Sequence, residues 1–358
     1  MRKDEFIQIA LDKKASDIHI APNAYPMLRV NGMLKAIEGS EIMTREQVFE
    51  AVKEICDVEQ LEKLEQAGEL NFSFSIKEYG RFRVNIIKQR GTYSLSIRIL
   101  KLIIPTKESL SLPDVVYDLA DQGKGLFVVS GAAGSGRSTT MASILQHLNE
   151  TQRLNIITVE SPIEYLFKHG ESIVLQRDVG IDCESTAQGV KSIMRHDPDV
   201  VMISDISDDN VLELALQIAE SGKLVIAGQS SINAVSAIES MIALSKPERV
   251  QNRKLKVAFN ILGIISQQLV PGKSEDRVLA YEMLLPNAAI RSHIISGNFS
   301  EVRNSLAVGR KQGMVTMDQN LFERYLKGDI TQDTLYKYCL DLEYVKRLAR
   351  TAHKGELS

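Results

Sequence analysis

The fold of this chain is decided by the stretch Gly131-Ala132-Ala133-Gly134-Ser135-Gly136-Arg137-Ser138-Thr139. It fits the phosphate-binding pattern G-x-x-x-x-G-K-[ST], except that Arg137 occupies the lysine position. An apolar run at 126–129 precedes the stretch, and a helical pattern at 139–148 follows it. Backbone N–H groups and a helix N-terminus would then converge on an anion. The sequence therefore predicts a strand, a phosphate-binding loop and a helix, in that order.

The residues of this loop have distinct expected roles. Gly131, Gly134 and Gly136 would let the backbone curl around phosphate without a Cβ in the way. Ser138 would supply a hydroxyl to Mg²⁺, and we count Ser135 and Thr139 in the same binding loop. A glycine-rich turn without a ligand is the alternative, and the order of strand, loop, hydroxyl pair and helix favours phosphate.

Arg137 is the unusual member of the loop. Lysine is a compact ammonium on a flexible stem, whereas arginine is a broad planar fork that does not place a point charge between β- and γ-phosphate oxygens. We therefore expect hydrolysis to suffer more than nucleotide affinity.

Further short apolar runs follow the loop, at 155–159, 200–203 and 224–227, and helical stretches separate them. Strands that are apolar on both faces indicate a parallel sheet covered on both sides, and hence an α/β domain. In such sheets, ligands lie at the carboxyl ends of the strands. Glu160 and Asp205 end two of these runs, so both are candidates for holding Mg²⁺ through water or for orienting the attacking water. We assign the metal site itself to Ser138 and Asp205. Each alone could equally be a solvated acid.

The chain is long enough for two domains. Alternating and helical patterns over 1–104 predict a smaller α+β domain, including an amphipathic helix at 44–66 in which Asp57 is an internal capping candidate. A polar stretch between two prolines predicts a linker at 105–122. The α/β domain is expected over 123–345, with a hairpin near Pro271, and a charged tail over 346–358.

Composition narrows the class of protein. A formal charge of −3 gives no global basic field, so a nucleic-acid motor is disfavoured. No apolar run is long enough to cross a bilayer, and the N-terminus lacks the apolar core of a signal peptide. We therefore expect a cytoplasmic protein.

Segments throughout the chain resemble the type II/type IV secretion ATPases, most closely the pilus retraction motors of twitching motility. The similarity runs from about residue 15 to residue 338. Besides the phosphate loop, the matching segments are Ala15-Ser16-Asp17-Ile18-His19, Gly80-Arg81-Phe82-Arg83-Val84-Asn85, Ile157-Thr158-Val159-Glu160-Ser161-Pro162-Ile163-Glu164, Arg195-His196-Asp197-Pro198-Asp199-Val200, Ile265-Ser266-Gln267-Gln268-Leu269, Ala289-Ile290-Arg291 and Gly313-Met314-Val315-Thr316-Met317-Asp318-Gln319.

This resemblance implies a PAS-like N-terminal domain joined to a RecA-like ATPase domain, in a hexameric ring with nucleotide between the domains. The cofactors expected are ATP and Mg²⁺. It implies that Arg81 and Arg83 reach the phosphates, although a solvated strand face is the alternative for both. It implies that Glu160 and Glu164 belong to the family's acidic box. The implied partner is an inner-membrane pilus or secretion platform protein, with the ring peripheral to the inner face of the membrane.

Several polar catalytic positions depart from the family pattern. Besides Arg137, Ser161 replaces the aspartate of Glu-Asp-Pro-Ile-Glu, Asp205 and Ser207 replace the glutamate and arginine of Gly-Glu-x-Arg-Asp, and Ser230 replaces a histidine. A glutamate-to-aspartate change withdraws the carboxylate by about 1.5 Å, and misplacement by roughly 1 Å can cost on the order of 100-fold in rate. Efficient turnover is therefore not expected.

Two functions are compatible with these residues. The first is an ATP-binding subunit of a hexameric pilus retraction or secretion motor with weak or absent hydrolysis. The second is a non-hydrolysing regulatory or structural ring component that modulates an active paralogous pilus ATPase.

Overall fold

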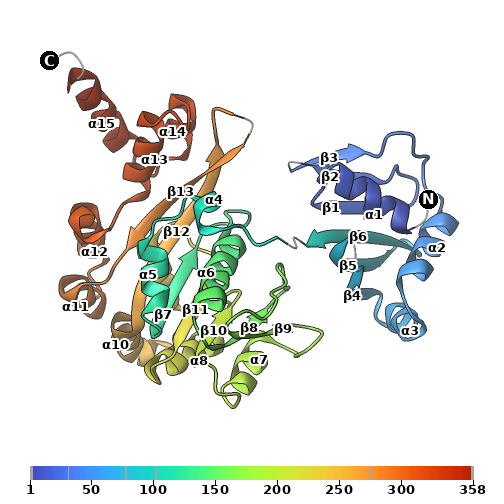
Figure 1. Cartoon of the computed structure of the whole chain (residues 1–358), viewed down its shortest axis with the longest axis horizontal. Helices are drawn as coiled ribbons and strands as arrows, with labels where there is room; N and C mark the ends of the chain where they lie inside the picture. Colours follow the sequence, from blue (N-terminus) through green and yellow to red (C-terminus); the bar gives the residue numbers. More distant parts are fainter. Residues whose placement is uncertain (1–2, 31, 77–78, 101–102, 275, 356–358) are drawn as a thin grey trace. The chain divides into compact units, whose positions relative to one another are not determined.

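The computed structural model describes residues 3–30, 32–76, 79–100, 103–274 and 276–355. The chain divides into two compact units (Figure 1): Met1–Ile103 with Glu164–Leu166, and Ile104–Ile163 with Phe167–Ser358. The first two residues of the predicted N-terminal domain and the last three of the predicted tail lie outside the described residues.

The first unit is built on a six-stranded antiparallel sheet, in the order β3-β2-β1-β6-β5-β4. The alternation of apolar residues explains which face is buried: on β5, Phe82 and Val84 are buried, whereas Arg81 and Arg83 are half-buried on the other face. The strands are β1 (Asp17–Ile20), β2 (Met27–Val30), β3 (Met33–Ala36), β4 (Glu69–Ile76), β5 (Gly80–Gln89) and β6 (Thr92–Leu100). The helices are α1 (Lys3–Asp12), α2 (Arg45–Ile55) and α3 (Val58–Ala67).

The single helix expected at 44–66 is two helices, because Asp57 starts a new one. Its side chain accepts a hydrogen bond from the backbone N–H of Gln60, and the Gln60 side chain accepts one from the N–H of Asp57. This reciprocal capping box stabilises a helix start, so the predicted internal cap becomes a boundary between α2 and α3.

The second unit is built on a seven-stranded sheet, in the order β13-β12-β7-β11-β10-β8-β9, in which only the β12–β13 pairing is antiparallel. The four apolar runs predicted as strands are its central, buried strands, and the predicted α/β class is confirmed. The strands are β7 (Gly125–Ser130), β8 (Asn155–Glu160), β9 (Ile173–Asp178), β10 (Val200–Ile203), β11 (Leu224–Gln229), β12 (Ile261–Pro271) and β13 (Arg277–Leu284).

Helices cover both faces of this sheet, which explains why its central strands are apolar throughout. On β7, Leu126 and Val128 pack against the side that carries α8 and α9, while Phe127 and Val129 pack against the side that carries α5 and α6. The helices are α4 (Lys107–Leu110), α5 (Val115–Asp121), α6 (Arg137–Thr151), α7 (Thr186–Ile193), α8 (Asp209–Glu220), α9 (Ala234–Ala243), α10 (Val250–Asn260), α11 (Ala288–Ser296), α12 (Phe299–Val308), α13 (Met317–Leu326), α14 (Gln332–Tyr338) and α15 (Leu342–Gly355).

The stretch expected as a linker, 105–122, is part of the second unit. It contains α4 and α5, and Val116 and Tyr117 of α5 are buried in the core beside α6. The Tyr117 and Ser143 hydroxyls lie 2.9 Å apart and share a hydrogen bond. A seven-residue helix with an apolar face is too short to show a clear period, and for this reason the sequence reads as polar connection.

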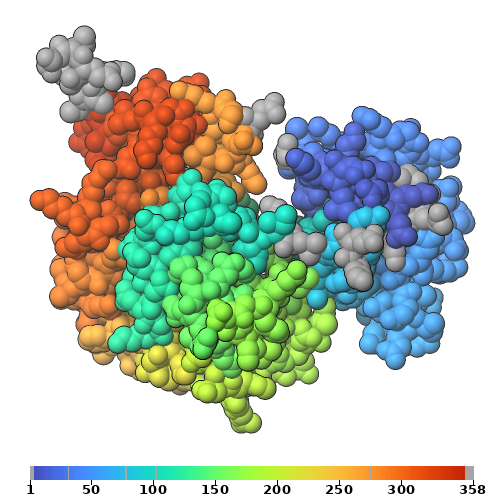
Figure 2. Space-filling model, in the orientation of Figure 1, coloured from blue at the N-terminus to red at the C-terminus, as the bar shows by residue number. Residues whose placement is uncertain are grey.

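Figure 2 shows the C-terminal part of the chain, from β12 through the C-terminal helices, as its orange and red surface. The expected charged tail begins inside α15, whose Val345 and Ala349 are buried, and α15 packs against α13. Among the described residues, no helix has the length and apolar character needed to cross a membrane.

Candidate functional site

The phosphate loop joins β7 to α6, in the predicted order of strand, loop and helix. Gly131, Gly134 and Gly136 have φ angles of 153°, 78° and 94°, in the left-handed region that favours glycine. The backbone therefore curls at the head of α6, where a helix N-terminus presents its free N–H groups.

Gly131 is also required by close packing. A Cβ there would lie 2.3 Å from the Ser135 hydroxyl oxygen and 2.5 Å from the backbone oxygen of Gln267. Gln267 lies on β12, and its side-chain Nε2 donates to the backbone oxygen of Ser135 at 3.1 Å. Next to it, the hydroxyls of Ser130 and Ser266 are 2.5 Å apart. Strand β12 thus forms the back wall of the loop, and this role of Gln267 was not predicted from the sequence.

The Ser135 hydroxyl is buried and has no hydrogen-bond partner among the described residues. Buried polar atoms are normally hydrogen-bonded. An unsatisfied hydroxyl inside a curled glycine loop fits a loop whose polar partners include a ligand.

Arg137 is drawn towards the ends of two other strands. Its Nη1 donates to Asp205 Oδ1 and to the Ser230 hydroxyl, at 3.0 Å in each case. The Arg137 side chain is 19% exposed and the Asp205 side chain 42%. Asp205 follows β10 and Ser230 follows β11, so the parallel order of the sheet brings both to the edge where the loop lies. Three of the residues that depart from the family pattern are therefore joined by hydrogen bonds. The sequence did not predict that these three substitutions are linked.

Glu160, at the end of β8, is held in place by its neighbours. It is 5% exposed, and its Oε1 accepts hydrogen bonds from Thr158 Oγ1 at 2.6 Å and Gln176 Nε2 at 3.0 Å. The backbone N–H of Ser161 donates to the Ser204 hydroxyl at 3.0 Å, which joins the end of β8 to the end of β10.

The ends of β10 and β11 also approach each other closely. A Cβ on Gly228 would lie 2.1 Å from the backbone oxygen of Ser204, and the Ile206 N–H donates to the Gly228 oxygen at 2.8 Å. Only glycine permits this approach. The backbones that carry Asp205 and Ser230 are therefore fixed relative to each other.

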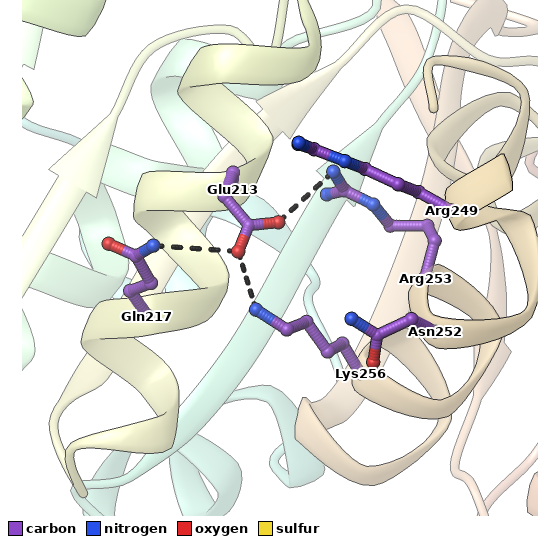
Figure 3. A pocket seen from close by; sticks show the side chains of 6 residues that line it. All are labelled: Glu213, Gln217, Arg249, Asn252, Arg253 and Lys256. Atoms are coloured by element: carbon purple, nitrogen blue, oxygen red, sulfur yellow. Dashed lines mark hydrogen bonds and ion pairs between the residues drawn. The ribbon is translucent and has the colours of Figure 1, made fainter. Parts of the chain in front are cut away.

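Helix α8 starts shortly after Asp205 and is braced by α10 (Figure 3). The buried Arg253 of α10 forms ion pairs with Asp209 and Glu213 of α8, and Lys256 adds a second cation at Glu213. Burial would raise the pKa of Glu213, but the hydrogen bond and charge of Lys256, together with Arg253, lower it. A cavity of about 290 Å³ beside these pairs is lined by Glu213, Gln217, Arg249, Asn252, Arg253 and Lys256. These pairs anchor the segment that follows Asp205.

The remaining predicted site residues belong to the first unit. Arg81 and Arg83 lie on β5, and Glu164 is grouped with this unit although its neighbour Ile163 belongs to the second. Their expected contact with nucleotide stays a prediction.

Comparison with known proteins agrees with this architecture. The family described as Type II/IV secretion system protein matches residues 2–319. The Type IV pilus ATPase PilU of Pseudomonas aeruginosa is 32% identical over 336 residues, which cover 93% of this chain and 87% of PilU. The Type IV pilus retraction ATPase PilT of the same species is 29% identical over 329 residues, covering 92% of this chain and 95% of PilT.

A solved structure is similar over nearly the whole chain. The crystal structure of the pilus retraction motor PilT with bound ADP superposes with a TM-score of 0.89 at 35% identity, covering 97% of this chain and 99% of that one. The predicted arrangement of an N-terminal domain and a RecA-like ATPase domain is confirmed by this similarity, as is the family resemblance. The chain belongs to the Type II/IV secretion system protein family, among its type IV pilus ATPases.

Proposed function

We propose that this chain is an ATP-binding subunit of a type IV pilus motor that hydrolyses ATP weakly or not at all. The observation that carries the proposal is the phosphate loop, whose backbone is intact while its cationic side chain is paired with Asp205. The backbone N–H groups and helix terminus that bind phosphate do not depend on the identity of residue 137. The similar PilT structure was solved with bound ADP, which supports a nucleotide here.

Weak hydrolysis follows from the side chains around the loop. Asp205 carries a shorter carboxylate than glutamate, and it is engaged by Arg137 instead of pointing freely at an attacking water. Ser230 has no imidazole to act as a cation or proton carrier. Ser207 supplies no charge for the developing phosphate oxyanion.

The fit of Mg²⁺ depends on the same contact. The sequence predicts Mg²⁺ at Ser138 and Asp205, and the Ser138 hydroxyl at the head of α6 is the usual type of ligand. Asp205, however, already accepts a hydrogen bond from a guanidinium. In this arrangement Asp205 is not suited to act as a metal ligand, because its carboxylate is paired with Arg137. Mg²⁺ at Ser138 and Asp205 stays a prediction from the sequence.

The assembly is proposed from the relatives. We propose a homo-oligomer, a hexamer formed alone or with an active paralogue, in which Arg81, Arg83 and Glu164 contact nucleotide beside Glu160 and the loop. Its partner would be an inner-membrane platform protein of the pilus or secretion system. The cytoplasmic location at the inner face of that membrane stays a prediction from the sequence.

Nucleotide binding is the first claim to test. Calorimetric titration of the purified full chain with ATP, ADP and GTP should show saturable heat for at least the adenine nucleotides. An absence of heat with every one of them at millimolar concentration would overturn the proposal, because both weak hydrolysis and a regulatory role through nucleotide require that the nucleotide binds.

A regulatory or structural ring component is the second candidate. The contact of Arg137 with Asp205 and Ser230 favours this role. At three positions where the family has catalytic side chains, this chain has residues that are hydrogen-bonded to one another, and such a subunit does not need to hydrolyse ATP to act in a ring. A strain carrying Arg137→Ala should then move on surfaces as the wild type does, whereas a deletion strain should not. A motility defect confined to Arg137→Ala would contradict this role.

A further inference from the structure

We propose that Arg137 takes the place of Mg²⁺ as the counter-charge of Asp205, so that this subunit binds nucleotide with little dependence on Mg²⁺. The proposal rests on the nucleotide binding proposed above and deepens it. The ligand would be a free nucleoside triphosphate or diphosphate, bound about as well as its magnesium complex.

The first step is the position of the guanidinium. It lies within the site and bonds the carboxylate that the sequence predicts as a metal partner, with 3.0 Å between Arg137 Nη1 and Asp205 Oδ1. An ion pair at this distance cancels most of the negative charge that Asp205 would present to a triphosphate. In a lysine-type loop a divalent cation has that task, because it lies between the acid and the phosphates.

The second step is the capacity of the arginine fork. A guanidinium has five N–H donors and no acceptor. Both printed contacts of Arg137, to Asp205 and to Ser230, use Nη1. Within the part of the chain that the structure describes, Nη2 and Nε of Arg137 make no hydrogen bond. The fork therefore has donors left for phosphate oxygens while it still neutralises Asp205, which a single ammonium does less well.

The third step is the mutual fit of the three side chains. A lysine at position 137 would end roughly one bond length, about 1.3 Å, short of the present Nη1. A glutamate at position 205 would reach about 1.5 Å further, into the guanidinium. A histidine at position 230 would put a larger ring, and a second cation when protonated, where a small hydroxyl now accepts from Arg137. Arg137, Asp205 and Ser230 therefore fit one another in size and charge. We assign the binding of magnesium-free nucleotide to these three residues together.

The experiment measures affinity for a fluorescent ATP analogue on the full chain, with millimolar Mg²⁺ and, separately, with excess EDTA. The wild type should show dissociation constants within threefold of each other. The triple variant Arg137→Lys/Asp205→Glu/Ser230→His should bind at least tenfold more weakly in EDTA. Arg137→Lys alone is a second variant, with the same direction of change, should the triple variant fail to fold.

Arg153→Lys is the matched control, because Arg153 pairs with Glu171 on the surface with its side chain 87% exposed. It should behave as the wild type. A wild-type protein that loses tenfold or more in EDTA overturns the proposal, and so do variants as insensitive to Mg²⁺ as the wild type. Absence of binding under both conditions would instead overturn the proposed nucleotide-binding function, so the two failures are distinguishable.

Discussion

Replacing Arg137, Asp205 and Ser230 together by lysine, glutamate and histidine, with Ser161→Asp added, should raise ATP turnover at least tenfold, whereas single replacements should raise it less than twofold. The reason lies in the contacts that the three side chains make with one another. Arg137 contacts both of the others, so each change made alone breaks at least one of these hydrogen bonds and leaves the remaining partner without its fitted neighbour.

The magnitude follows from the distances. Arg137 Nη1 and Asp205 Oδ1 are 3.0 Å apart. Lengthening the acid alone by one C–C bond, about 1.5 Å, would bring its oxygen into steric overlap with the guanidinium unless one side chain moves away. The new glutamate would then be misplaced by roughly 1 Å or more, an error able to cost on the order of 100-fold in rate. With lysine at position 137 this obstruction disappears, and a tenfold gain corresponds to about 1.4 kcal/mol of barrier.

The assay is phosphate release by the purified protein at saturating nucleotide, for the four single variants, the triple variant and the quadruple variant. Bound nucleotide is quantified in parallel, so that turnover is compared at equal occupancy. The reasoning would be refuted if Arg137→Lys alone recovered the full gain, because the three positions would then be independent. No gain in the quadruple variant would place the defect in the scaffold instead.

Three further predictions concern stability. Gly131→Ala should lower the thermal midpoint of the second unit well below that of Gly222→Ala, because both positions have positive φ but no atom lies within 4 Å of a Cβ on Gly222; equal midpoints would contradict the packing around Gly131. Arg253→Met should cost about 1–3 kcal/mol in urea unfolding, since it removes a buried cation from two carboxylates that are partly exposed; a cost below 0.5 kcal/mol, typical of surface changes, would argue against the bracing of α8. Burial opposes ionisation of Asp17, but hydrogen bonds from Arg98 and Ser16 outweigh it and lower the pKa below the ordinary 3.8. The stability it contributes is therefore present above 3.8 and is lost as the pH falls through the folded value. Asp17→Asn should be less stable than the wild type at pH 7 and approach it in acid, and a difference independent of pH would exclude this linkage.

The core of the second unit could be predicted from sequence because its strands are apolar on both faces. A run of four apolar residues such as Val200–Ile203 is typical of a strand that is buried on both faces. Strand β9 was missed because its apolar run, at 173–175, is only three residues long and is followed by the polar Gln176 and Arg177. Ile173 and Leu175 are exposed at the edge of the sheet. Local pattern is weak where a strand is covered on one side only.

The site was predictable in outline and not in its contacts. The rule that ligands lie at the carboxyl ends of parallel strands placed Asp205 on the edge that carries the loop, and the structure has it there. The direct contact of Arg137 with Asp205 and Ser230 is a matter of side-chain reach, between residues 68 and 93 positions apart. The support from Gln267 was likewise hidden, because β12 pairs with β7 only through the folded order of the sheet.

The wall that β12 forms behind the phosphate loop has a practical consequence for dissecting the protein. A shortened chain that stops after β11 would retain every residue of the nucleotide motif but lose the amide that donates to the Ser135 backbone oxygen and the hydroxyl partner of Ser130. The smallest piece able to shape its own nucleotide pocket must therefore extend through Gln267. Because β12 is itself covered by its antiparallel neighbour, that minimal piece includes β13 as well.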